Sequence, residues 1–294
     1  MFIQLLANGL VTGSVIALAA AGVSIVYGIL RLVNFAYGDY MTFGAFSAVY
    51  FNVTLELPIV AAAILAMLAT ALLSIALELV LWKPVRARDA GFMSLFLVSI
   101  GLALVLRHVI YLVAGPQPRT YTVDPYKVYV IGSARLSGAQ GIAIVIAGIG
   151  ILVLGVLIAK TGVGRMMRAL ADDLPLAAVS GVRTNRVILA AWIVSGLLAG
   201  LAGVLAGLVQ TSFNPQLGFT LLLPIFAAVV LGGIGSVYGA LAGGLALGLA
   251  MELSTWPELG GGVNPTYKPV VAFAALILVL LLRPQGLFGK ARVV

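Results

Sequence analysis

The chain alternates between long apolar runs and short polar segments along nearly its whole length. Apolar runs cover residues 2–29, 58–82, 91–114, 139–159, 187–210 and 267–282, and a run at 32–51 is interrupted by polar residues. A spanning helix needs about 20 mostly apolar residues, whereas the strands of a membrane barrel alternate over about 10 residues. Because these runs are long and continuous, the pattern predicts an all-α, polytopic helical membrane protein.

One further run, residues 218–252, is too long for a single span, because such a helix would reach about 50 Å through an apolar core of about 30 Å. It is interrupted by Gly232-Gly233-Ile234-Gly235-Ser236. We therefore expect two short helices that meet at a glycine break. Counted with the other runs, this pair gives about 8–9 spans in one transmembrane domain over residues 1–294.

The distribution of basic residues predicts which ends of the helices face the cytoplasm. Of the 17 Lys and Arg residues, 12 lie at Arg31, in segments 83–90 and 160–186, and after residue 282; Arg107 lies within a run and four lie elsewhere. Short cytoplasmic loops carry such an excess. The N-terminus, which lacks a basic leader and is expected to be a first span, is then outside and the tail inside. This orientation requires an even number of membrane crossings between the run at 187–210 and the run at 267–282. Residues 218–252 must therefore form a hairpin or a re-entrant pair.

Composition places most of the chain in a lipid bilayer, because 62% of the residues are hydrophobic and only 9% are charged. The net charge of +8 is explained by the loops, so no nucleic-acid partner is expected. The chain has no cysteine, one histidine (His108) and no glycine-rich phosphate-binding motif with the required Lys-Ser or Lys-Thr. We therefore expect neither an enzyme nor a bound metal or cofactor.

The polar segment 160–186 holds the clearest helix signals outside the apolar runs. Asp172 or Asp173 can cap a short helix with Pro175 in its first turn, and Gly181 can end it. Such an element on a basic loop suits docking to a soluble partner. The alternative is a solvated cytoplasmic loop that satisfies the positive-inside rule alone.

Ionisable residues within the apolar runs are costly and are therefore functional candidates. They are Asp39, Glu78, Arg107 and Glu252. Each has a simpler interpretation: a helix cap for Asp39, the membrane interface for Glu78, an outward-snorkelling side chain for Arg107, and an outer vestibule for Glu252. They lie towards the ends of the runs, which disfavours a carboxylate relay of the kind that an ion-coupled transporter needs.

Two breaks in the apolar runs expose backbone groups, at Asn34–Gly38 and at Gly232–Ser236. Irregular backbone in a membrane is tolerated where it is buried in protein or borders a pathway. A path with few polar groups would suit a neutral, hydrophobic solute. Close packing of small residues explains the same glycines without a pathway.

Several motifs together resemble the LivH-type permease subunits of branched-chain amino-acid ABC importers. They are NFAYGD at 34–39, GRMMRALADD at 164–173, LGGIGSVYGA at 231–240 and RPQGLFG at 283–289, and the similarity covers nearly the full length. The resemblance implies an ABC importer permease fold and alternating access driven by ATP. It also implies transport of branched-chain or other neutral hydrophobic amino acids, although the family includes permeases for urea and short amides.

The resemblance further implies partners and a location. We expect a second, homologous permease subunit, two cytoplasmic ATPase subunits that use ATP and Mg²⁺, and a periplasmic or lipid-anchored amino-acid-binding protein at the outer loops. The expected location is the inner or plasma membrane of a bacterium or cyanobacterium. An ion-coupled secondary transporter is the alternative, and a structural membrane scaffold is disfavoured by the broken helices.

Two sets of site residues follow. The resemblance places coupling to the ATPases in loop 160–186, at Gly164, Arg165, Arg168, Asp172, Asp173, Leu174, Pro175, Ala178 and Gly181. The two helix breaks give the candidates for the translocation pathway: Asn34, Gly38, Asp39, Gly232, Gly233, Gly235 and Ser236.

Overall fold

A computed structural model describes residues 2–88, 90–123, 128–131, 134–257, 262–283 and 285–288. Its main helices are α1 (Phe2–Leu30), α2 (Tyr37–Val49), α3 (Ile59–Leu77), α4 (Lys83–Arg86), α5 (Phe92–Ala114), α6 (Gly138–Lys160), α7 (Gly162–Asp172), α8 (Leu174–Val179), α9 (Thr184–Gln210), α10 (Leu217–Gly232), α11 (Val237–Leu253) and α12 (Lys268–Leu282). Two π turns, η1 (Tyr50–Thr54) and η2 (Glu78–Trp82), continue α2 and α3, and a 3₁₀ turn, η3 (Pro265–Tyr267), precedes α12. Lys127, Lys290 and Arg292, which the charge count includes, lie outside the described residues.

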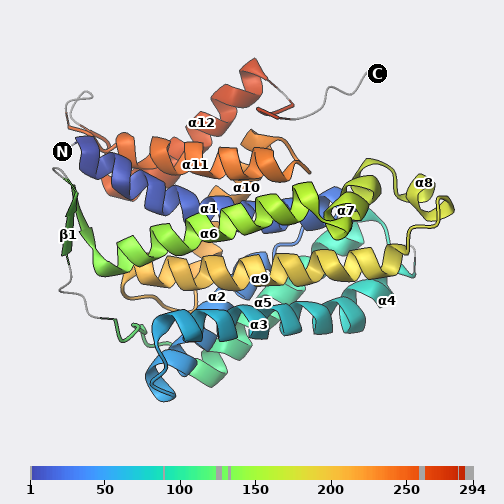
Figure 1. Cartoon of the computed structure of the whole chain (residues 1–294), viewed down its shortest axis with the longest axis horizontal. Helices are drawn as coiled ribbons and strands as arrows, with labels where there is room; N and C mark the ends of the chain where they lie inside the picture. The colour runs from blue at the N-terminus through green and yellow to red at the C-terminus, as the bar shows by residue number, and fades with distance from the viewer. Residues whose placement is uncertain are drawn as a thin grey trace.

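The bundle is built around α1 and α9, which lie side by side near its centre with the other long helices around them (Figure 1). Small residues make this possible, because α1 and α9 are rich in Ala and Gly and their backbones approach their neighbours closely. The surrounding helices α5, α6 and α12 expose most of their apolar side chains. An apolar exterior of this kind matches a lipid environment, and six described helices are long and apolar enough to cross a membrane.

The long run 218–252 forms two helices, as its glycine break predicts. Helix α10 ends at Gly232 and α11 begins at Val237, and the two pack antiparallel, with Gly232 against the Gly239 backbone. Helix α11 also runs antiparallel to α1: a Cβ on Gly13 would lie 3.1 Å from the Leu245 Cα. The prediction of a hairpin at this position is confirmed.

The third span extends further than its sequence suggests. The basic segment from Lys83 is predicted to be a loop, but the helix continues through Arg86. The π turn η2 precedes Pro84, and the Lys83 N–H bonds to the Glu78 carbonyl across it. The wider turn lets the helix pass a proline, which cannot donate a backbone hydrogen bond.

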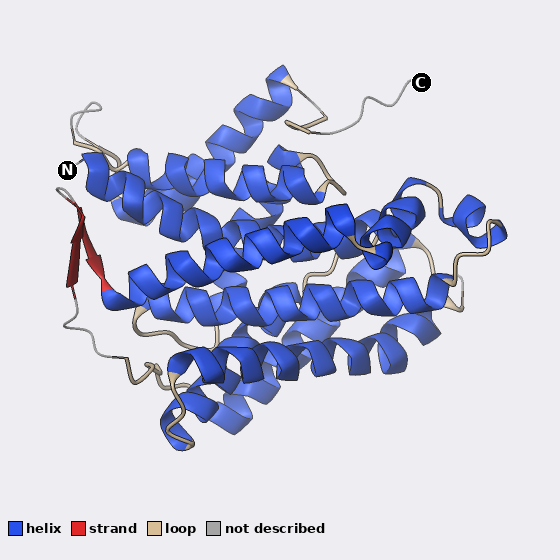
Figure 2. Cartoon of the chain, in the orientation of Figure 1, coloured by secondary structure: helices blue, strands red, loops and turns tan. Residues whose placement is uncertain are grey.

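At one end of the bundle, a short hairpin of strands β1 (Val128–Ile131) and β2 (Ala134–Ser137) follows α5 (Figure 2). Nearby, Tyr121 packs against Phe213, and its hydroxyl donates to the Ala45 carbonyl at 3.1 Å. Burial raises the pKa of Tyr121 well above its usual value, so this hydroxyl stays protonated and keeps its bond.

Candidate functional site

The polar segment between α6 and α9 folds into two short helices rather than one. Thr161 caps α7, since its hydroxyl accepts the Gly164 N–H at 3.0 Å. Arg168 on α7 donates to the carbonyl of Ile158 on α6, which ties α7 to the bundle. Met167 and Leu170 are buried against the bundle, while Arg165 is exposed. Helix α7 is not among the elements predicted from the sequence, although its apolar residues recur at three-residue spacing.

Helix α8 follows directly and has a well-defined cap at each end. The Asp173 carboxylate accepts the Leu176 N–H at 2.9 Å, and Pro175 lies in the first turn. At the other end Gly181 has φ +85°, and the Gly181 and Val182 N–H groups bond to the carbonyls of Ala178 and Ala177. This is a Schellman motif, which requires a left-handed residue where Gly181 stands. The caps at Asp173 and Gly181 agree with the sequence prediction.

Helix α8 lies at the far tip of the molecule, beyond the ends of the long helices (Figure 1). Its side chains are apolar yet exposed: Leu176 is 60% exposed and Val179 is 83% exposed. Leu174 and Ala178 are exposed as well, and Ala177 is the buried residue of this helix. Unlike the apolar residues of α5 or α12, these belong to a polar segment at the end of the bundle. An exposed apolar helix at such a place is typical of a protein interaction site.

The glycine break between α10 and α11 lies at the same end of the bundle. Gly233 and Gly235 have positive φ values of 103° and 86°, which explains the need for glycine there. Ser236 caps α11 by accepting the Gly239 N–H at 3.1 Å. The chain after α12 returns to this break, where the Leu287 and Phe288 N–H groups bond to the Leu231 and Gly232 carbonyls.

The remaining pathway candidates are packed inside the bundle. Asn34 is 3% exposed, and its side-chain oxygen accepts the Ala36 N–H at 3.1 Å. Gly38 meets the backbone of Gly218 on α10. Asp39 is fully buried and accepts hydrogen bonds from Arg107 at 3.0 and 3.3 Å.

The four ionisable residues in the apolar runs are all held in ion pairs. Arg107, which was expected to snorkel outward, binds Asp39, and Asp39 does not cap a helix. Glu78 binds Arg86 across the π turn and is buried within the bundle. Glu252 accepts hydrogen bonds from Lys268 Nζ at 2.7 Å and from the Thr12 hydroxyl at 3.4 Å. The outward-snorkelling interpretation of Arg107 and the helix-cap interpretation of Asp39 are therefore wrong, whereas the interface position of Glu78 and the outer-vestibule position of Glu252 stay predictions.

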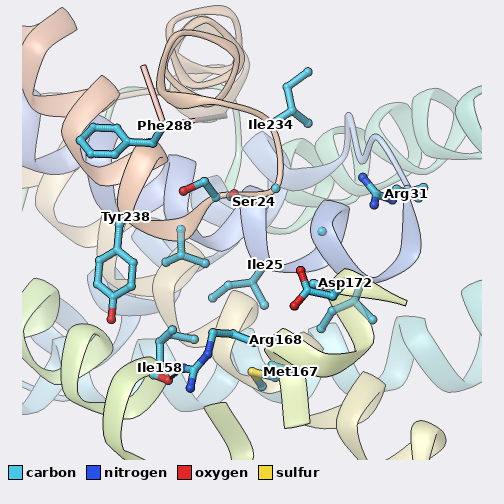
Figure 3. A pocket seen from close by; sticks show the side chains of 16 residues that line it. Ser24, Ile25, Arg31, Ile158, Met167, Arg168, Asp172, Ile234, Tyr238 and Phe288 are labelled. Atoms are coloured by element: carbon cyan, nitrogen blue, oxygen red, sulfur yellow. Dashed lines mark hydrogen bonds between the residues drawn. The ribbon is translucent and has the colours of Figure 1, made fainter. Parts of the chain in front are cut away.

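A cavity of about 450 Å³ brings residues of the two candidate sets together (Figure 3). Arg168 and Asp172 of the coupling set line it, and so do Gly235 and Ser236 of the pathway set. Ser24, Gly28 and Ile29 of α1 form another wall. A second cavity of about 340 Å³ adjoins it and shares Asp172. None of Asn34, Gly38 and Asp39 is among the lining residues of either cavity.

These features define a multi-pass helical membrane protein with an exposed apolar helix at one end. The fold is similar to that in the structure of PsaBC from Streptococcus pneumoniae in complex with Fab, with a TM-score of 0.51 and 14% sequence identity. The match covers 98% of this chain and 94% of that chain. At this identity the likeness concerns the fold alone.

Residues 5–280 match the family model described as the branched-chain amino acid transport system / permease component, and the chain belongs to this family. It is 32% identical over 305 residues to the high-affinity branched-chain amino acid transport system permease protein LivH of Salmonella typhimurium, covering 99% of this chain and 97% of the relative. It is 33% identical over 308 residues to BraD of Pseudomonas aeruginosa, with the same coverage. The resemblance inferred from the sequence motifs is confirmed.

Proposed function

We propose that this chain is the membrane permease subunit of an ATP-driven importer for branched-chain or other neutral hydrophobic amino acids. The relatives LivH and BraD are permease proteins of branched-chain amino acid transport systems, and they match the chain from end to end. The chain would form the passage together with a second, homologous permease subunit in the bacterial inner membrane. A periplasmic or lipid-anchored binding protein would deliver the amino acid from outside.

The observation that supports this proposal best is the capped, exposed apolar helix α8. Leu176 and Val179 offer an apolar surface to a soluble partner, and the caps at Asp173 and Gly181 fix the direction of the helix. Two cytoplasmic ATPases would receive one such helix from each permease subunit. ATP and Mg²⁺ would be bound by those partners, and this chain would bind no cofactor of its own. ATP-driven closure would then move α8 and open the passage alternately to each side.

The ion pairs argue against an ion-coupled transporter. The three carboxylates described within the apolar runs, Asp39, Glu78 and Glu252, are each paired with a cation. A carboxylate that carries a proton or sodium ion must lose and regain its partner in each cycle, which is costly for a buried pair. The pairs therefore fit a structural role better than ion coupling.

The test is purification of the tagged chain from its native membrane, followed by mass spectrometry and by uptake assays in proteoliposomes. We expect two ATPases, a second permease and a binding protein to accompany it, and ATP-dependent uptake of leucine, isoleucine or valine. Uptake of urea or a short amide instead would reject the amino-acid substrate. A homo-oligomer without ATPases that takes up solute along an ion gradient would reject the ATP-driven mechanism.

A matched pair of variants tests α8 directly. Val179→Ser replaces the most exposed apolar side chain of α8, and we expect it to weaken co-purification of the ATPases and to lower uptake. Leu112→Ser, at an 85% exposed apolar position on the lipid-facing helix α5, is the control and should retain the ATPases. Equal retention of the ATPases by both variants would show that α8 is not the docking element.

A further inference from the structure

The cavity between α1, α7 and the glycine break contains an unused hydrogen-bonding group. The hydroxyl of Ser24 is fully buried and has no hydrogen-bond partner among the described residues, yet Ser24 lines the cavity. In Figure 3 this hydroxyl points towards the side where Phe288 and Tyr238 lie. A buried hydroxyl without a hydrogen-bond partner is unfavourable, so a polar ligand that reaches it is favoured.

The same side of the cavity can hold a negative charge. Val237 and Tyr238 lie in the first turn of α11, and both line the cavity. The first N–H groups of a helix have no acceptor within the helix, and they carry the positive end of its dipole. With the Ser24 hydroxyl, this turn provides donors of the kind that a carboxylate needs.

The opposite side carries a negative charge of its own. Asp172, at the end of α7, directs its carboxylate towards Ile25 across the middle of the cavity (Figure 3). Arg168 stands one turn earlier on the same helix, so the wall offers both signs of charge. Between the two polar sides the lining is apolar, with Ile25, Ile158 and Met167.

We infer that this cavity is a binding site for the zwitterion of an apolar α-amino acid, an inference that rests on the proposed function. The carboxylate lies at Ser24 and the first turn of α11, the ammonium group at Asp172, and the side chain among Ile25, Ile158 and Met167. The volume of about 450 Å³ falls in the usual range of about 300–1,000 Å³ for small-molecule pockets. Because Asp173 begins α8 directly after Asp172, an amino acid leaving the passage would bind beside the helix proposed to contact the ATPases.

The test is photolabelling of the complex purified from its native membrane, without added binding protein, by a leucine analogue that carries a diazirine in its side chain. We expect labelled peptides that contain Ile25, Ile158 or Met167. Excess L-leucine should compete, whereas 4-methylpentanoate, which lacks the ammonium group, and 3-methylbutylamine, which lacks the carboxylate, should not. Absence of label from these peptides would overturn the inference, and so would equal competition by all three compounds.

Two pairs of variants locate the polar contacts. Asp172→Asn should reduce labelling about tenfold or more, since it removes one charge-assisted hydrogen bond. Its control is Glu56→Gln, an exposed carboxylate that does not line the cavity, which should label normally. Ser24→Ala should also reduce labelling, whereas Ser14→Ala on the same helix, whose hydroxyl already donates to the Leu10 carbonyl, should not. Unchanged labelling in both Asp172→Asn and Ser24→Ala would overturn the assignment.

Uptake assays on the same preparation separate this inference from the proposed function. If the complex with its binding protein imports leucine with ATP but these peptides carry no label, the cavity site is rejected and the transport function stands. If the peptides are labelled as expected but no import occurs, the cavity binds amino acids and the transport function is rejected.

Discussion

Asp39 and Arg107 show how a single pair of residues joins elements far apart in the sequence. Asp39 lies in the first turn of α2 and Arg107 on α5, and the two side chains are bonded at 3.0 Å. The Arg107 guanidinium also lies 4.2 Å from the centre of the Phe219 ring on α10. One arginine thus links three helices, and α5 otherwise exposes much of its surface.

We predict that Asp39→Asn destabilises the protein strongly, because it leaves the mostly buried Arg107 charge without its partner. Removing one member of a buried pair typically costs about 3–5 kcal/mol. The measurement is the thermal unfolding midpoint of the detergent-solubilised complex, with Glu56→Gln, an exposed carboxylate, as the control. The double variant Asp39→Asn with Arg107→Gln should recover part of the loss. A single variant as stable as the control would show that the pair does not hold the three helices.

Gly181 is the second residue whose chemistry decides local structure. Its φ of +85° costs a residue with a Cβ about 1–2 kcal/mol, although no atom lies within 4 Å of an added Cβ. We predict that Gly181→Ala weakens the end of α8 and lowers uptake per ATP hydrolysed in the reconstituted complex. Gly162→Ala is the control, since that position is equally open and its φ is not positive. Identical coupling ratios in the two variants would contradict a role for the Schellman motif.

At the scale of elements, the crossing of α2 and α10 depends on two glycines. A Cβ on Gly38 would come within 2.5 Å of the Gly218 carbonyl oxygen, and the Gly218 N–H bonds to the Thr42 hydroxyl at 3.0 Å. The two backbones therefore touch with no space for a side chain. This contact places the NFAYGD segment against the start of α10.

We predict that Gly38→Ala forces these helices apart and destabilises the protein by about 1–3 kcal/mol, as overpacking typically does. Gly101→Ala on α5 is the control, because a Cβ there meets nothing within 4 Å. The yield and unfolding temperature of the purified protein give the comparison. Equal stability of Gly38→Ala and Gly101→Ala would show that the crossing tolerates a methyl group.

The helices themselves could be predicted from the sequence, because lipid requires long apolar runs and glycines and basic residues mark where they end. The break at Gly232–Ser236 and the caps of α8 at Asp173 and Gly181 are local signals of this kind. The partner of Arg107 could not be predicted, since Asp39 is 68 residues away in the sequence. The return of Leu287 and Phe288 to the end of α10 could not be predicted either, because their contacts are backbone hydrogen bonds, which leave no trace in the pattern of side chains.

At the scale of the whole molecule, the fold places two kinds of surface at opposite ends of the bundle. The β-hairpin and the N-terminal end of α1 lie at one end, and α7 and α8 lie at the other (Figure 1). The cavity lies at the end with α7, because Met167, Arg168 and Asp172 of that helix line it. Arg31, Arg86, Arg168 and Arg183 belong to the end with α8. The positive-inside rule therefore assigns that end to the cytoplasm.

This orientation is testable with unusual clarity because the chain has no cysteine of its own. We predict that Gln117→Cys, exposed in the connection after α5, reacts in intact cells with a maleimide that cannot cross the membrane. Val179→Cys on α8, which is 83% exposed, should react only after the membrane is opened, because the proposed orientation places α8 on the cytoplasmic side. The reverse pattern would show that the molecule has the opposite orientation, with α8 outside the cell. Helix α8 could then not couple the chain to ATP hydrolysis in the cytoplasm. Labelling at both positions in opened membranes serves as the control that each cysteine is reactive.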